Sequence, residues 1–334
     1  MLNTELRPTP PFSLTILVLT LTAAASLLIA LGLGSVHLSF TDLLSMVSTA
    51  SADTLEKTVL LQLRLPRALT AFALGGLLAL SGVLMQVLLR NPLADPYILG
   101  SSGGAAAAAL LAMLMGINGW PVELAATWGA FIAILLVFAL AHAEGSWSPT
   151  RLLLTGVIVA AGCGALVSLL LALSDETSLR GMLYWLMGEI THTQRALPLW
   201  LLMIGTGGVS YFLARHLNVM SRGELQAQTL GLNIKQIRIG LFALSALLTA
   251  AAVTTAGSIG FVGLIIPHLA RRLVGADHRR LVPAVILMGG SLLTLADTAA
   301  RTLFAPRQMP IGALTALIGV PVFIFLMFKQ QYRH

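Results

Sequence analysis

The residues best suited to catalysis or metal binding are scattered along this chain of 334 residues. Its seven histidines form no pair at ligand spacing on one helix, and its single cysteine, Cys163, lies inside an apolar run typical of packing. No P-loop, HExxH, EF-hand or nucleophile-elbow pattern occurs. The sequence therefore predicts no catalytic residue, no metal site and no nucleotide-binding loop on this chain.

Charge is confined to short stretches between long apolar ones. Hydrophobic residues make up 57% of the chain, charged residues 10%, and the mean hydropathy is +0.89. Soluble domains carry about 25% charged residues, and disordered chains need low hydrophobicity, so both classes are excluded. The net charge of +7 is dispersed among apolar segments, which is typical of loops flanking membrane spans rather than of a nucleic-acid surface. We expect an integral membrane protein.

The apolar stretches set the number of spans, because a helix needs about 20 apolar residues to cross the bilayer core. Nine windows qualify: 13–34, 68–89, 97–118, 121–141, 152–173, 196–214, 239–270, 281–300 and 308–328. The window 239–270 is too long for one straight helix and is interrupted at Gly257, Gly260, Gly263 and Pro267. It is either one kinked span or two passes.

Lysine and arginine favour two passes, since cytoplasmic loops carry an excess of both. With two passes, thirteen of the 20 fall inside and seven outside; with one pass the split becomes nine to eleven. The sequence thus predicts an all-α, polytopic membrane protein with ten transmembrane helices. Residues 1–334 form one transmembrane domain with both termini cytoplasmic, residues 1–12 being the cytoplasmic N-terminus.

Two segments are neither spans nor simple loops. Residues 174–195 lie outside, in the periplasm, and contain an apolar stretch long enough only for a short helix. Residues 215–238 lie inside, where Ser221 and Glu224 have the spacing of a capping box and Gly231 stands where a helix would stop. This pattern predicts a short capped helix on the cytoplasmic face. It is either a docking surface or a solvated connector.

Several long motifs carry a resemblance to a known family. They are QLRLPR at 62–67, GGLLALSG at 75–82, RNPLADP at 90–96, GSIGFVGLIIPH at 257–268, ADTAAR at 296–301 and the run 309–323. At these residues the chain resembles the permease subunit of type II ABC importers, the iron-chelate and cobalamin uptake family. The resemblance spans roughly residues 15–330 and is specific for the family, not for the substrate.

The resemblance implies a transporter subunit of the cell inner (plasma) membrane rather than an enzyme. Two permease chains, identical copies or paralogues, would form a dimer with the pathway at its axis. Two ATP-binding subunits would hold ATP and Mg, so no cofactor belongs to this chain. A periplasmic substrate-binding protein would deliver a metal chelate, either a ferric siderophore, haem or cobalamin.

The resemblance also assigns roles to three arginines at the outer ends of spans, where nearness to water makes charge inexpensive. Arg64, Arg67 and Arg301 match arginines that pair with carboxylates on the two lobes of the binding protein. Charges at the rim of an interface mainly steer docking and set its register. The alternative is that these side chains are snorkelling anchors.

Three further groups of residues are assigned in the same way. The ATPase-coupling group is Ser221, Arg222, Gly223, Glu224, Leu225, Ala227, Leu230 and Gly231. The cytoplasmic gate comprises Asn91, Leu93, Ser148 and Thr150, in turns that otherwise read as ordinary tight turns. The pathway lining is Gly156, Gly162 and Gly164, glycines that would either let a bulky chelate pass or let helices touch.

Two other functions are weighed against this one. A self-powered secondary carrier or channel would need carboxylates at mid-membrane or loops of filter-like carbonyls, and the centres of the predicted spans are almost free of ionisable groups. An intramembrane enzyme would need a nucleophile and base, or a ligand set, within the spans. An importer permease powered by a partner fits the sequence best.

Overall fold

The structure is a computed structural model that describes residues 12–34, 55–142, 149–190 and 196–331. Every element in these ranges is a helix, which confirms the all-α prediction. The longer helices fall on the expected windows: α1 (Phe12–Gly32), α4 (Leu65–Leu89), α5 (Ser101–Leu114), α6 (Trp120–His142), α7 (Pro149–Leu173), α9 (Ala196–Phe212), α12 (Ile234–Ala256), α13 (Val262–Val274), α14 (His278–Thr302) and α15 (Ile311–Gln331).

Shorter elements connect them: α3 (Leu55–Thr58), the π-helical η1 (Val59–Arg64), the 3-10 helix η2 (Pro96–Leu99), α8 (Glu176–Met187), α10 (Ala214–Arg222) and α11 (Glu224–Thr229). Among the described residues, six helices are long and apolar enough to cross a membrane, and α9 with α10, bent by 62°, makes a seventh if the pair is one span. α5 and the part Ile311–Phe325 of α15 are shorter apolar helices. The count of ten and the cytoplasmic termini therefore stay predictions.

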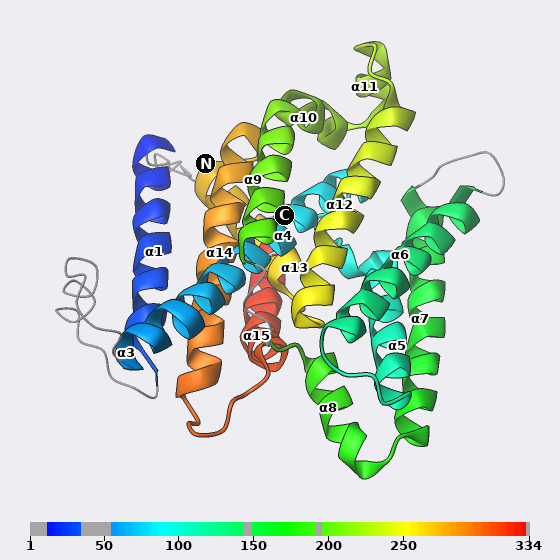
Figure 1. Cartoon of the computed structure of the whole chain (residues 1–334). Helices are drawn as coiled ribbons and strands as arrows, with labels where there is room; N and C mark the ends of the chain where they lie inside the picture. The colour runs from blue at the N-terminus through cyan, green and yellow to red at the C-terminus, as the bar shows by residue number, and fades with distance from the viewer. Residues whose placement is uncertain (1–11, 35–54, 143–148, 191–195, 332–334) are drawn as a thin grey trace.

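α4 lies at the centre of the bundle (Figure 1), and its most apolar stretch is completely buried. α14, α12, α13 and α9 pack around it. The crossing with α14 is close because two glycines meet there: a Cβ on Gly75 would overlap the carbonyl oxygen of Gly289. Small residues at such crossings let membrane helices approach one another, since packing replaces the hydrophobic effect as the driving force.

A buried hydroxyl network joins α4 to α12. The Ser81 Oγ lies 2.8 Å from the Ser245 Oγ and 2.7 Å from the Thr249 Oγ1, and it also donates to the Ser245 carbonyl oxygen at 3.0 Å. Hydrogen bonds of this kind hold helices together in an apolar medium, where an unpaired hydroxyl would be unfavourable. These hydrogen bonds fix the register of α12 against the central helix α4.

The window 239–270 breaks between α12 and α13, as the sequence predicted. The irregular backbone there is satisfied from η2, because the Tyr97 hydroxyl accepts from the Ile259 N–H and donates to the Ile259 carbonyl oxygen, both at 3.0 Å. Irregular backbone within a membrane protein requires such internal partners. η2 occupies part of the window 97–118, so α5 begins later than that window.

The bundle has two distinct ends (Figure 1). α8 and the connection from α14 to α15 lie at the lower end in that view, and α10 and α11 lie at the upper end. Following the predicted topology, we name these the outer end and the inner end. The predicted docking arginines and the predicted coupling segment therefore lie at opposite ends of the molecule.

Candidate functional site

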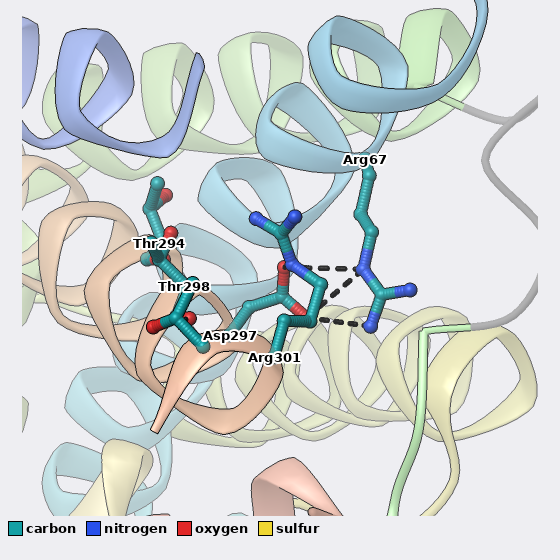
Figure 2. A network of polar contacts seen from close by, with 6 residues as sticks. Arg67, Thr294, Asp297, Thr298 and Arg301 are labelled. Carbon is teal, nitrogen blue, oxygen red and sulfur yellow. Dashed lines mark hydrogen bonds and ion pairs between the residues drawn. The ribbon is translucent and has the colours of Figure 1, made fainter. Parts of the chain in front are cut away.

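The outer end carries a buried ion-pair cluster. Arg67, near the start of α4, donates from Nε to both carboxylate oxygens of Asp297 at 3.1 Å and from Nη2 to Oδ1 at 3.0 Å. Asp297 lies on α14, 230 residues away, and its side chain is only 1% exposed. Figure 2 shows both arginines converging on this carboxylate. Arg67 is therefore held in one geometry by a forked pair.

Arg301 completes the cluster from the next turn of α14. Its Nε donates to the Asp297 Oδ2 at 3.0 Å, while its Nη2 is buried without a hydrogen-bond partner among the described residues. Two guanidinium groups thus share one carboxylate, and one positive charge remains in excess. Asp297 was not predicted as a site residue. Its contact with Arg67 leaves no local signal, but its i, i+4 spacing to Arg301 is one that could have indicated it.

Arg64 takes a different role. Its side chain is buried, and its Nη1 donates to the carbonyl oxygens of Leu31 at 2.7 Å and Gly32 at 3.2 Å, at the end of α1. A cation there satisfies carbonyls that have no partner in the helix and interacts favourably with the helix dipole. The three side chains are less exposed than expected: Arg67 and Arg301 are 17% and 13% exposed, and Arg64 is 4% exposed.

The predicted coupling segment forms two short helices instead of one. Ser221 lies within α10 and donates its hydroxyl to the Asn218 carbonyl oxygen at 2.8 Å. Gly223, with φ of 132°, separates α10 from α11, and Arg222 is the last residue of α10. The capping box predicted for Ser221 and Glu224 is wrong, because Gly223 is the cap of α11 and Ser221 bonds back into its own helix.

Glu224 instead joins three elements at the inner end. Its Oε1 accepts from the Arg90 Nη2 at 3.0 Å and from the Arg238 Nη2. Arg90 caps the end of α4 in a left-handed conformation with φ of 50°, and Arg238 lies in the first turns of α12. The carboxylate therefore ties α11 to both of these helices. Neither arginine was predicted as a site residue.

Two leucines are exposed on and directly after α11. Leu225 is 79% exposed and Leu230 is also exposed, whereas Ala227 is fully buried against the bundle. Gly231, with φ of 77°, lies just after the helix, where the sequence predicted its end. Two large apolar side chains are thus exposed at the inner end, within the predicted coupling segment.

The predicted gate residues lie in and beside turns at the inner end. The Asn91 Oδ1 accepts from the Leu93 N–H at 2.9 Å, which closes the turn after α4, and the Leu93 side chain is exposed. Thr150 is exposed in the first turn of α7. Ser148 lies outside the described residues. The structure does not bring Thr150 into contact with the Asn91 turn through any described hydrogen bond.

The three glycines of α7 divide into two kinds. Gly156 is buried, and a Cβ there would overlap the Ile98 carbonyl oxygen, so this glycine lets η2 approach α7. Gly162 and Gly164 are exposed, and a Cβ added at either would meet no described atom within 4 Å. The two interpretations left open by the sequence thus apply to different residues: Gly156 serves a helix contact, and the other two lie on an open face.

Comparison with known proteins decides the family. Residues 21–329 match the model of the FecCD transport family. The chain belongs to this family. It is 40% identical to the hemin transport system permease protein of Yersinia pestis over 91% of this chain and 94% of that protein. It is 37% identical to the molybdate import system permease protein of Haemophilus influenzae over 94% of this chain and 95% of that protein.

The fold agrees with this assignment. A solved structure described as the inward-facing conformation of a metal-chelate type ABC transporter aligns with a TM-score of 0.85 and 36% identity. The alignment covers 95% of this chain and 99% of that one. This FecCD chain therefore has the fold of a type II ABC permease and is a multi-pass protein of the inner membrane.

Proposed function

We propose that this chain is the permease subunit of an ABC importer that moves a metal chelate from the periplasm to the cytoplasm by alternating access. Two copies would form the dimer, two ATP-binding subunits would hold ATP and Mg and power it, and a periplasmic binding protein would deliver the cargo. The proposal rests on the different surfaces at the two ends of this FecCD chain. At the outer end two arginines share one carboxylate and leave a positive charge in excess, and at the inner end two leucines are exposed.

The outer cluster supports docking of an acidic protein. Asp297 fixes Arg67 and Arg301 in position but neutralises only one of their two charges. The side chains of Arg67 and Arg301 keep 17% and 13% of their surface exposed, and through this part a carboxylate of the binding protein could pair with the charge in excess. Pre-oriented guanidinium groups lose little entropy on pairing, which favours a defined docked geometry. Arg64 would contribute by holding the end of α1 beside the cluster.

The inner end supports coupling to an ATPase. Leu225 and Leu230 would enter the cleft of that subunit, and Gly223 would let α11 tilt without bending α10. Motion of α11 would reach the gate through the Glu224 carboxylate, because its partner Arg90 directly precedes the Asn91 turn. ATP-driven movement and the predicted gate are then joined by one ion pair.

The class of cargo can be proposed, but the individual molecule cannot be chosen from sequence identity. Relatives at similar identity bear the names of hemin, molybdate and vitamin B12 import permeases, so sequence identity does not choose among them. We favour a metal chelate, with ferric siderophore, haem and cobalamin as candidates. The open face of α7 that carries Gly162 and Gly164 would line the pathway at the dimer axis, whereas Gly156 would not.

The test is ATP hydrolysis by the reconstituted complex. Permease, ATPase and binding protein are combined in liposomes, and the rate is measured with the binding protein empty or loaded with haem, cobalamin, a ferric siderophore or molybdate. We expect one loaded form to stimulate hydrolysis and its cargo to accumulate inside. If the permease took up cargo alone, without the ATPase, the importer function would be contradicted and that of a secondary carrier supported.

A further inference from the structure

A polar cavity of about 170 Å³ opens at the inner end, between the end of α4, the start of α14 and α10. Its rim is exposed and includes Arg90, Pro92 and Ser221. Its floor is buried, with Gln86 4% exposed and His278 2% exposed. The cavity is large enough for a small ion of several heavy atoms with its water.

Several buried polar atoms that belong to residues lining this cavity have no partner in the part of the chain that the structure describes. They are both amide atoms of Gln86, the Nη1 of Arg271 and the Nε2 of His278. Leaving a buried donor or acceptor unpaired costs about 1–3 kcal/mol each, and native proteins rarely do so. A concentration of four such atoms around one cavity points to a ligand that pairs with them.

The hydrogen bonds around His278 decide which of its ring nitrogens is the donor. The Asn218 Nδ2 donates to the Asp277 Oδ1 at 2.8 Å, so its Oδ1 is the atom that faces His278. That oxygen accepts from the His278 backbone N–H at 2.9 Å and lies 2.6 Å from the His278 Nδ1. Nδ1 must therefore carry the proton, and in the neutral ring Nε2 offers a lone pair to the cavity.

The charges around the cavity favour an anion. Arg271 and Arg90 line it with two guanidinium groups, and Arg90 shares Glu224 with Arg238. The nearby Asp277 carboxylate does not line the cavity, because it accepts from the Asn218 side chain and from the Arg279 N–H at the start of α14. The hydrogen bond from Asn218 lowers the pKa of Asp277, which keeps that carboxylate ionised as part of the cap.

We propose that this cavity binds a monoprotonated phosphate group, either orthophosphate or the phosphomonoester of a lipid headgroup. Phosphate oxygens would accept from the Arg271 Nη1 and the Gln86 amide nitrogen, and the P–OH would donate to the His278 Nε2. Such a group supplies the negative charge and a donor for the His278 Nε2. The Gln86 Oε1, the second acceptor without a partner, would take its donor from a water in the same cavity. Sulfate, which carries no proton near pH 7, matches the arginines but not the histidine.

The position of the site gives it a consequence that rests on the proposed function. Pro92 belongs to the predicted gate turn, and Ser221 to the predicted coupling segment. A bound phosphate would bridge α4, α13 and α14 between these two, and so would hold the gate turn against the coupling helices. Binding itself requires only the residues of the cavity.

The test is ligand-dependent thermal stability of the full chain in lipid-free detergent at pH 7. Orthophosphate and sulfate are titrated at equal ionic strength against the wild type, Arg271→Gln and Gln86→Leu. Arg272→Gln, a change of the neighbouring exposed arginine outside the cavity, is the matched control. A ligand that binds only the folded state raises the melting temperature in proportion to its affinity.

We expect saturable stabilisation by orthophosphate, weaker stabilisation by sulfate, and a loss of affinity of tenfold or more in Arg271→Gln but not in Arg272→Gln. Gln86→Leu removes two unpaired buried atoms, so it should fold at least as well as the wild type while binding phosphate several-fold more weakly. No saturable effect on the wild type, equal stabilisation by sulfate, or equal affinity in Gln86→Leu would overturn the proposal.

A second arm separates the two sources of phosphate. Dihexanoyl phosphatidate is compared with orthophosphate, and dihexanoyl phosphatidylcholine serves as the control that lacks a phosphomonoester. Tighter binding of phosphatidate would identify a lipid headgroup, and tighter binding of orthophosphate a soluble ion. Because the chain is tested alone, a negative result would leave the permease role untouched.

Discussion

The two ends of this permease present charge and apolar surface in opposite ways. At the outer end the charged groups are buried and held by one another, as in the cluster of Arg67, Asp297 and Arg301. At the inner end the ion pairs of Glu224 are partly exposed, and α11, which begins with Glu224 directly after Gly223, exposes Leu225. A rigid, pre-oriented surface suits a partner that must dock in one register, whereas a mobile one suits a partner that drives motion.

The largest effect is expected from Asp297→Ala. The change leaves two largely buried guanidinium groups, 17% and 13% exposed, without their carboxylate. Breaking a fully buried pair costs about 3–5 kcal/mol, which sets the upper limit here. The melting temperature of the purified chain should fall steeply. Asp175→Asn, on the exposed loop before α8, is the control and should melt like the wild type. Equal stability of Asp297→Ala would contradict a rigid outer end.

A pair of glycine substitutions sharpens the comparison. In Gly312→Ala at the outer end, the new methyl would overlap the carbonyl oxygens of Met187 and Ser258, and overpacking of this kind costs about 1–3 kcal/mol. Gly223→Ala has open space but must adopt φ of 132°, which disfavours only the local junction. We expect Gly312→Ala to lower the melting temperature, and Gly223→Ala to leave it unchanged.

Hydrogen exchange separates these two effects by location. Gly223→Ala should speed exchange in α11 alone, because that helix is short and exposed. If Gly223→Ala instead lowered the global melting temperature as much as Gly312→Ala, the inner end would be as firmly packed as the outer one.

Glu224→Gln tests the ion pairs at the inner end. Arg90 and Arg238 would lose their shared carboxylate, but partial exposure limits the cost to about 1 kcal/mol or less. We expect near-normal stability with ATP hydrolysis no longer linked to uptake in the reconstituted complex. Gln228→Ala on the exposed side of α11 is the control and should transport normally. Full coupling in Glu224→Gln would remove this carboxylate from the route to the gate.

A small effect on stability is also expected from Leu225→Ser. Because this side chain is 79% exposed, the substitution should change the free energy of unfolding by no more than about 0.5 kcal/mol. Affinity for the ATPase should nevertheless fall, as measured by co-purification. Leu197→Ser, an exposed leucine at the start of α9, is a control outside the coupling segment.

Local patterns in the sequence predicted the fold better than the site. Long apolar windows give the helices, and the glycines after Thr255 give the break between α12 and α13, because both depend on neighbouring residues. The capping box at Ser221 failed for a related reason: the same spacing also fits a serine that bonds back to Asn218, and the glycine break decides between them.

Such local patterns could not predict contacts between residues that are far apart in the sequence. Asp297 meets Arg67 across 230 residues, and Glu224 meets Arg90 from another helix. Gly156 and Gly162 look alike in sequence, yet only Gly156 faces another backbone. Burial of the arginines was missed because their position near span ends suggested water, whereas the fold supplies a carboxylate and helix carbonyls instead.

The most direct test of the two-ended arrangement measures both partners on the same variants. Wild type, Arg301→Gln and Leu225→Ser are placed in nanodiscs, and binding of the periplasmic protein and of the ATPase is measured separately. Arg301→Gln should fold, since Asp297 keeps Arg67 as its partner. We predict that Arg301→Gln loses the binding protein and keeps the ATPase, and that Leu225→Ser does the reverse. If either variant lost both partners, or lost neither, the two-ended arrangement would be contradicted.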